Sequence, residues 1–176
     1  MTIASFRTAL RAHTSDRHAR LDSAVGLFDT AEQYGAYLDA SYRFRKATEW
    51  ALRDFAGWSV APLAGLIGDD LADLGRGVPA ATGLPPPPDD AFALGMAYVL
   101  EGSALGARLL ERRAAGLGFD ERHGARHLAA QISDKRRWPD FLARLEAVQP
   151  GARDDVIAGA ASTFDFALDI YAGEPA

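Results

Sequence analysis

The chain of 176 residues contains no cysteine. This absence excludes disulfide bonds, thiolate-bound metals and cysteine nucleophiles, and it fits the reducing cytoplasm, where we expect the protein to act. The sequence also lacks a run of eighteen apolar residues, so we expect no membrane-spanning helix. Its N-terminal residues contain no apolar core followed by a cleavage site, which argues against secretion.

A positive net charge is missing as well. The formal charge is −5, which argues against general nucleic-acid binding. The chain has no GxSxG elbow, Walker loop or GxGxxG motif, so classical hydrolases and nucleotide-binding proteins fit poorly. His123 and His127 are four residues apart, but no third ligand lies nearby, and we expect no metal site there.

Strand-forming alternation is weak, whereas segments rich in alanine and leucine dominate, so the predicted class is all-α. Because the composition is uniform, we expect residues 1–176 to form a single domain. Helices are predicted over about residues 5–24, 30–55, 62–74, 91–115, 120–131, 134–148 and 152–172. Residues 75–90, rich in glycine and proline, are predicted to form a surface connector. Three aspartates are expected to form a solvated edge: Asp69, Asp70 and Asp73.

The segment 95–110 is unusual for a helix, because a glycine inside a helix costs about 1 kcal/mol relative to alanine. Gly102 and Gly106 are four residues apart and therefore lie on one helix face. Ser103 and Ala107 widen that face with two further small side chains. One interpretation is close helix packing or a bend. The other is a planar ligand that lies against the bare backbone.

A second segment, residues 10–25, places His18 on the same helix stripe as Leu10 and Thr14. A lone histidine on an apolar face is usually a core or surface residue, but histidine is also the commonest metal ligand. Arg11 lies on the same side of the helix. Two such helices could hold a flat cofactor between an imidazole and a bare backbone.

Three cations follow one another near the start of the 134–148 helix: Lys135, Arg136 and Arg137. Cations at a helix N-terminus oppose the helix dipole. They are therefore either fully solvated or compensated by an anion, for which the acidic edge groups of a cofactor are candidates.

At this point the sequence resembles the bacterial haem oxygenases, of the biliverdin-forming kind associated with bacteriophytochromes. The resemblance is carried by LRAHTSDRHARLD at residues 10–22 and YVLEGSALGARLL at residues 98–110. The distal motif of the family ends in two glycines, and here Ala107 replaces the second. Weaker matches cover residues 136–142 and the final helix, so the resemblance spans nearly the whole chain.

The resemblance implies an all-α, haem oxygenase-like multi-helical bundle, with haem clamped between a proximal and a distal helix. It implies that His18 is the axial iron ligand. The implied distal wall consists of Gly102, Ser103, Gly106 and Ala107. The implied contacts to haem and its propionates are Arg11, Thr14 and Tyr98, together with one or more of Lys135, Arg136 and Arg137.

The implied activity is O2-dependent opening of haem b to biliverdin, carbon monoxide and ferrous iron, with haem as both cofactor and substrate. Electrons would come from an external reductase, a flavoprotein or a ferredoxin. Two departures from the family matter: the methyl group of Ala107, and Ser103 near the position where animal members carry an aspartate. They leave open a haem carrier or sensor on the same fold. A helical interaction module is a third reading, in which His18 and the glycines serve packing only.

Overall fold

The computed structural model describes residues 5–173, and within them all regular structure is helical. In chain order the elements are α1 (Phe6–Val25), α2 (Ala31–Ala51), α3 (Ala64–Asp73), α4 (Asp90–Gly102), α5 (Ala104–Gly116), α6 (Arg126–Ser133), α7 (Arg137–Glu146), a short 3-10 turn (Pro150–Ala152) and α8 (Arg153–Tyr171). The predicted all-α class is confirmed.

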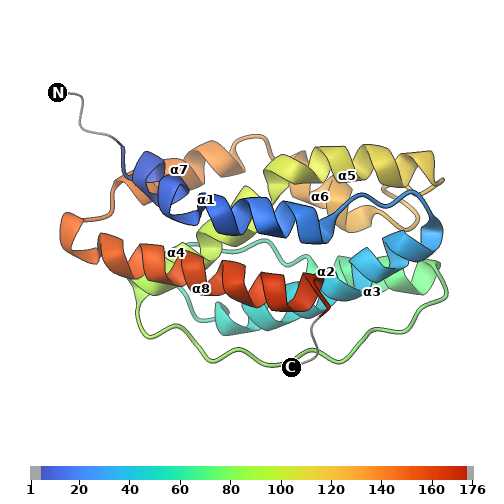
Figure 1. Cartoon of the computed structure of the whole chain (residues 1–176), viewed down its shortest axis with the longest axis horizontal. Coiled ribbons are helices and arrows are strands. Elements are labelled where there is room, and N and C mark those ends of the chain that lie inside the picture. The colour runs from blue at the N-terminus through green and yellow to red at the C-terminus, as the bar shows by residue number, and fades with distance from the viewer. Residues whose placement is uncertain (1–4, 174–176) are drawn as a thin grey trace.

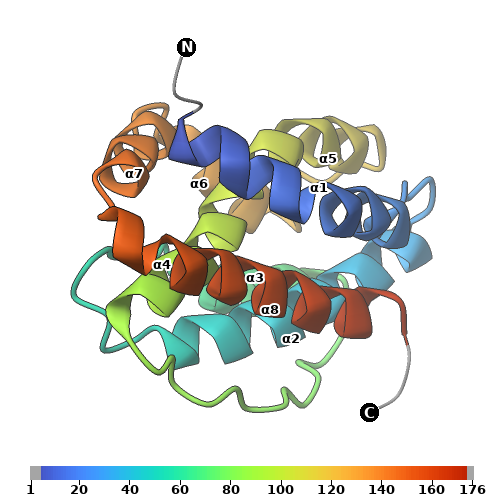
Figure 2. The same cartoon turned by 60° about the vertical axis from the view of Figure 1, so that its left-hand side comes forward.

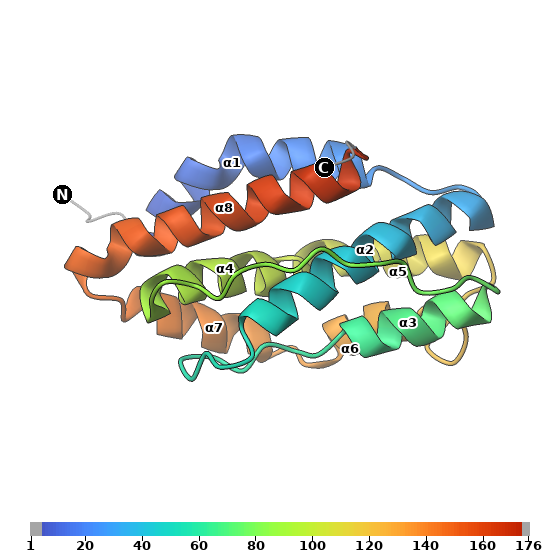
Figure 3. The same ribbon diagram turned by 90° about the horizontal axis from the view of Figure 1, so that it is seen from below.

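The helices stack in three layers (Figure 3). The first consists of α1 and α8, which lie side by side (Figure 1). The second contains α2, α4 and α5, and the third contains α3, α6 and α7. A view from another side shows α1, α5 and α7 along one side of the molecule and α2 and α3 along the other (Figure 2). Two apolar clusters hold the layers together. One is built mainly from α1, α4, α7 and α8, and the other from α2, α3, α5 and α6.

The first two helices begin where their side chains predict. Ser5 caps α1, because its hydroxyl accepts a hydrogen bond from the Thr8 amide. Thr30 caps α2 in the same way from the Gln33 amide, while the Gln33 side chain accepts from the Asp29 amide. The predicted starts at residues 5 and 30 are therefore confirmed, but α2 ends at Ala51 and not at residue 55.

Backbone contact joins α4 to α8. A Cβ atom placed on Gly95 would lie 2.0 Å from the carbonyl oxygen of Val156, and one on Gly159 would lie 2.1 Å from that of Phe92. Both positions therefore require glycine, since no side chain fits between the helices. Close helix packing thus explains these two glycines, and it fixes α4 against the layer that carries α1.

The helix predicted over residues 91–115 is not continuous, which corrects the sequence-based expectation. It is divided at Ser103 into α4 and α5. The Ser103 hydroxyl donates to the carbonyl of Leu100 at 2.6 Å, and Arg45 of α2 donates to the same carbonyl at 3.2 Å. A side chain that inserts into the backbone ladder is a common cause of such a break. Beyond it, α5 packs on α6 and no longer follows α8.

The connector between α3 and α4 crosses α2 in an extended conformation (Figure 3). Arg76 anchors its beginning by ion pairs with Asp39 and Glu32 of α2. The predicted surface connector is confirmed. No helix in the part of the chain that the structure describes is long and apolar enough to cross a membrane.

The third layer departs from prediction at two turns. Residues 120–125 form a turn, in which Gly124 has a φ of 80°, and α6 begins only at Arg126. Lys135 and Arg136 lie in the next turn, because α7 starts at Arg137 and not at residue 134. The sequence had suggested that His123 and His127 share a helix. In the structure His123 lies in the turn before α6, so they do not.

Candidate functional site

The histidine singled out in the sequence lies on an uncovered part of α1. The buried residues of this helix are Phe6, Leu10 and Thr14, all in its first half. His18 follows on the same stripe, yet 61% of its side chain is exposed. Its ring contacts the edge of Phe164 on α8, with 5.9 Å between centroids. The apolar stripe thus continues from the core to a histidine that touches α8 at one edge and is otherwise exposed.

One nitrogen of this imidazole has a partner. His18 Nδ1 lies 3.0 Å from Oδ2 of Asp22, one turn further along α1. A carboxylate beside Nδ1 favours the imidazole form that carries its proton on that nitrogen, and Nε2 is then the nitrogen with a lone pair for a metal. The pair is exposed to solvent, so its effect on stability is small.

The distal segment offers an equally uncovered face. A Cβ atom on Gly106 would meet nothing within 4 Å, and one on Gly102 would touch only the Trp138 ring at 3.6 Å. Leu105 and Leu109 are the exposed apolar side chains of α5, with exposed fractions of 63% and 45%. Gly106 therefore does not serve helix packing in the folded chain, in contrast to Gly95. Its bare backbone and two neighbouring leucines are arranged to contact something apolar.

The other two residues of the predicted distal wall face inward. The Ala107 side chain is 1% exposed and belongs to the cluster formed by α2, α3, α5 and α6. The hydroxyl of Ser103 also turns into the chain, where it lies 2.6 Å from the carbonyl of Leu100 and 2.6 Å from the side-chain amide of Gln131. The extra methyl group of Ala107 is thus accommodated in the core.

The first half of α1 meets α4 through Thr14 and Tyr98. Thr14 is buried and donates to the carbonyl of Leu10 at 2.9 Å. Burial raises the pKa of Tyr98, and Thr14 and the charges of Arg7 and Arg11 act in the opposite direction. These two arginines are exposed and give the first half of α1 a positive edge.

The cationic triplet of the α6–α7 turn is divided by the structure. Arg137 donates to both carboxylate oxygens of Glu101, at 2.7 and 2.6 Å, and lies over the Trp58 ring. Its guanidinium is committed to a half-buried ion pair, so we no longer count it as a partner for a ligand. Lys135 and Arg136 are exposed.

Arg45 is a charged residue that the sequence analysis missed. It lies on α2 with 6% of its surface exposed, and it donates to Leu100 O at 3.2 Å and to Ser103 Oγ at 3.0 Å. Burial lowers its pKa, although the nearby Glu49 carboxylate acts in the opposite direction. Its spacing from Tyr37 and Ser41 is the signal that could have revealed it, since these steps of four residues form a polar stripe on an otherwise aromatic helix.

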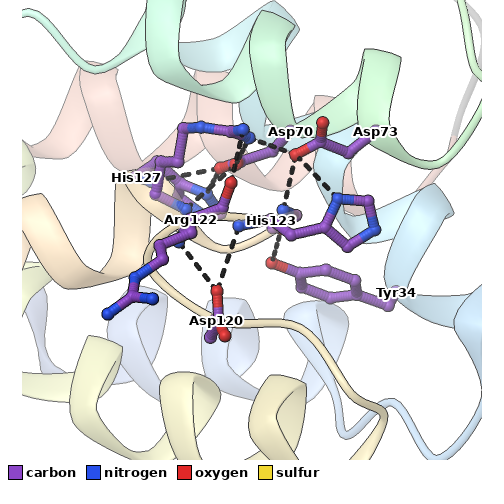
Figure 4. Close-up of polar contacts among 9 residues, drawn as sticks. Tyr34, Asp70, Asp73, Asp120, Arg122, His123 and His127 are labelled. Atoms are coloured by element: carbon purple, nitrogen blue, oxygen red, sulfur yellow. Dashed lines mark hydrogen bonds and ion pairs between the residues drawn. The ribbon is translucent and has the colours of Figure 1, made fainter.

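A second buried polar group lies between α3 and α6 (Figure 4). Nδ1 of His127 is 2.7 Å from Oδ2 of Asp70, and its Nε2 is 3.4 Å from the hydroxyl of Tyr37. Burial lowers the pKa of His127 against the opposing effect of Asp70. Burial would raise the pKa of Asp70, but hydrogen bonds from His127 and Arg126 outweigh it and the pKa is lowered. The neutral imidazole therefore donates to Asp70 and accepts from Tyr37.

This group corrects the expected solvated edge at Asp70 and Asp73, whereas Asp69 is exposed as predicted. Asp70 has no exposed surface, and Asp73 is paired with Arg126 and with the amide of Gly124. His123 lies beside Asp73 at 3.5 Å (Figure 4). The aspartates attach α6 and its preceding turn to α3, so the role of this cluster is to hold the helix on which α5 rests.

Taken together, the uncovered surfaces offer one available imidazole nitrogen, one stretch of bare backbone, two exposed leucines and a positive edge. They lie on the adjacent layers of α1 and α5 (Figure 3). This set suits a flat, largely apolar molecule that carries a metal and acidic groups at one edge. Trp138 lies against Gly102 at one end of the same face.

Comparison with known proteins gives a consistent picture. No family model matches the chain. Heme oxygenase PigA of Pseudomonas aeruginosa is 34% identical over 166 residues, which cover 86% of this chain and 84% of the relative. Heme oxygenase of Xanthomonas campestris pv. campestris is 34% identical over 146 residues, covering 76% and 86%. The structure of the heme oxygenase from Neisseria meningitidis, studied in its NO- and CO-bound forms, matches with a TM-score of 0.81 and 28% identity over 99% of this chain and 95% of that one.

Proposed function

The chain belongs to the haem oxygenase family, and from that premise we propose that it binds haem between His18 of α1 and the bare backbone around Gly106 of α5. As a haem oxygenase it is an enzyme that degrades haem to biliverdin with release of iron. The comparisons favour this activity over a non-enzymatic carrier or sensor. The observation that carries the site is the open space at Gly106.

The side chains present fit the haem group. His18 has its Nδ1 beside Asp22, so Nε2 is available for iron. Leu105 and Leu109 expose apolar surface that a porphyrin would cover. Gly106 lowers the stability of its helix, and no other side chain lies where its Cβ atom would be. A ligand that packs directly against the backbone explains why glycine is present there. Each of these features is difficult to explain in a chain that binds nothing here.

When bound, haem supplies both the iron at which O2 is reduced and the ring carbon that is oxidised. His18 would supply the iron ligand, with Asp22 beside its Nδ1. The bare backbone at Gly106 would leave room for the ring and the oxygen while restricting their position. Leu105 and Leu109 would help to keep bulk water away from the bound ring.

The acidic edge of haem needs cations, and we propose Arg11 as the first of them. It is exposed on the first half of α1, and its charge acts on the hydroxyl of Tyr98. Lys135 and Arg136 are exposed in the α6–α7 turn and remain candidates for the second propionate. Thr14 is buried and its hydroxyl donates to the carbonyl of Leu10, which makes its role indirect.

We further propose that the reaction uses O2 and electrons from an external reductase, flavoprotein or ferredoxin, because no side chain of the chain can supply them. Carbon monoxide is then the one-carbon product, since opening the ring removes one bridging carbon. A link to bacteriophytochrome pigment supply remains a proposal that rests on the sequence resemblance alone.

A hemin titration tests the site. Purified protein mixed with hemin should develop a sharp Soret band with saturation at one equivalent. His18→Ala should lose that band shape and weaken binding, because it removes the iron ligand. His13→Ala is the matched control, since His13 is an exposed histidine about 140° round the same helix.

Two results would contradict the proposal. An unchanged Soret band in His18→Ala would remove the assigned iron ligand. Bound hemin that yields no biliverdin with ascorbate or a reductase system would favour the carrier.

A further inference from the structure

At the break between α4 and α5, two backbone groups bond to side chains of other helices instead of to each other. In a continuous helix the amide of Ala104 would donate to the carbonyl of Leu100. Here Leu100 accepts from Arg45 at 3.2 Å and from Ser103 at 2.6 Å. The side-chain carbonyl of Gln131, in the orientation its neighbouring donors require, accepts from the amide of Ala104 at 3.2 Å and from Arg45 at 3.1 Å. Side chains of α2 and α6 thus occupy the two backbone groups that would otherwise bond to each other.

Arg45 is costly at this position. Its side chain lies inside the helix bundle, and placing a cation there requires desolvation that an apolar residue of similar length would avoid. Its Nη2 bonds go to the carbonyl and hydroxyl at the break. A residue that only filled space between α2 and α4 would have no need of a charge. The guanidinium is therefore explained by the acceptors that it holds.

The break determines where the distal wall lies. Before it, backbone contact between Gly95 and Val156 fixes α4 against α8. After it, α5 rests on α6, and the bare backbone of Gly106 points into open space. A continuous helix would carry residue 106 onward along α4, close to the layer of α1 and α8. The separation between α1 and α5 therefore depends on the bonds made at residues 100–104.

We propose that Arg45 is a positioning residue, which holds the break open and so sets where the backbone of Gly106 meets the substrate. This inference rests on the proposed function, because it concerns the same distal wall. Arg45 acts through Leu100 and Ser103 and touches no reacting atom. Its removal is expected to change the geometry of the wall more than the affinity for haem, since His18 and Arg11 lie on another helix.

Arg45→Met tests this, because methionine keeps an apolar stem of similar length and removes the donors. We expect the amide of Ala104 to return to Leu100, which in apo protein is seen as a shifted amide resonance and about tenfold slower hydrogen exchange. In the loaded enzyme, turnover should fall roughly 10- to 100-fold, and the ratio of biliverdin isomers should change. The midpoint of the hemin titration should move less than threefold.

Three further variants sharpen the test. Arg43→Met removes the same charge from an exposed position two residues away on α2 and should leave the Ala104 amide and the isomer ratio unchanged. Arg45→Lys keeps one donor for Leu100 and should restore part of both properties. Gln131→Leu removes the partner of the Ala104 amide from the half-exposed side of α6 and should change the isomer ratio in the same direction.

The outcomes separate the two proposals. If Arg45→Met folds but the Ala104 amide and the isomer ratio match wild type, the positioning role is wrong. If Arg45→Met does not fold, Gln131→Leu decides, and wild-type values in that variant overturn the role. If His18→Ala leaves the hemin spectrum unchanged, the proposed function is wrong instead. The Ala104 amide measurement on the apo protein would still test whether Arg45 holds the break.

Discussion

Gly106→Ala should have opposite effects on the apo protein and on the loaded enzyme. A Cβ atom at this position meets nothing within 4 Å, and the backbone there is helical. Alanine in a helix is favoured over glycine by about 0.5–1 kcal/mol. Without haem, the variant should therefore be more stable by about that amount, which raises Tm by about 1–4 °C for a chain of this size.

With haem, the same methyl group should be harmful. If the porphyrin and oxygen lie against this backbone, a carbon atom added there displaces one of them by a distance of the order of 1 Å, which can lower turnover by about 100-fold. The assay is a pair of measurements on one preparation: Tm of the apo protein by circular dichroism, and the initial rate of biliverdin formation. We expect Tm to rise and the rate to fall.

Gly65→Ala is the matched control. Gly65 lies in α3, and a Cβ atom there also meets nothing within 4 Å. It should raise Tm by a similar amount and leave the rate unchanged. A Gly106→Ala variant that is both more stable and fully active would refute the reasoning, because the open space would then not be reserved for the substrate. A variant with lower apo stability would refute the packing analysis.

Three other predictions follow from the same structure. Gly95→Ala should destabilise the protein by at least about 1–3 kcal/mol in chemical denaturation, because its Cβ atom would lie 2.0 Å from the carbonyl of Val156; a cost below 0.5 kcal/mol would show that α4 and α8 separate easily. Arg11→Glu should weaken hemin binding by about tenfold, which corresponds to 1.4 kcal/mol, whereas Arg20→Glu on the opposite side of α1 should not; equal midpoints in the titration would exclude Arg11 as a propionate partner. The free energy of unfolding should fall as pH drops below about 6.5, with a slope of at most about 1.4 kcal/mol per pH unit, because the buried His127 has a lowered pKa and stays neutral while the unfolded chain takes up a proton. Urea midpoints measured between pH 7 and 5.5 should depend less on pH in His127→Gln than in wild type. An equal pH dependence in the variant would mean that other groups cause the effect.

The sequence predicts the all-α class and the starts of the first two helices well, because these depend on local patterns. Ser5 and Thr30 mark helix starts through hydrogen bonds to amides three residues away. The motifs around His18 and Gly106 carry the family resemblance, and their spacing alone places each on one face of a helix. These features need no knowledge of how distant segments meet.

The break at Ser103 could not be predicted from the chain near it. Besides the local Ser103 hydroxyl, it involves a guanidinium that comes from α2, 58 residues away in sequence. The burial of Asp70 was missed for the same reason, since its partners His127 and Arg126 lie on α6. In both cases a charged residue looks solvated in the sequence, and only the fold shows what compensates its charge.

The two glycine pairs also illustrate what spacing cannot decide. Gly102 and Gly106 attract attention because their spacing predicts a shared helix face, yet the break at Ser103 separates them, and Gly95 and Gly159 are the positions where helices touch. No local pattern distinguishes a glycine that admits a neighbouring helix from one that leaves space for a ligand. The distinction requires the positions of atoms from other segments.

The backbone contact between α4 and α8 also determines which part of the molecule can yield when a large planar substrate enters and its open-chain product leaves. Up to residue 102 the distal segment is locked to the same layer that carries His18, so that half of the molecule behaves as a rigid base. Beyond residue 103 the chain is supported by α6, a helix of eight residues. If haem binds as proposed, its entry and the exit of its product should therefore displace α5 more than the side of the site that carries His18.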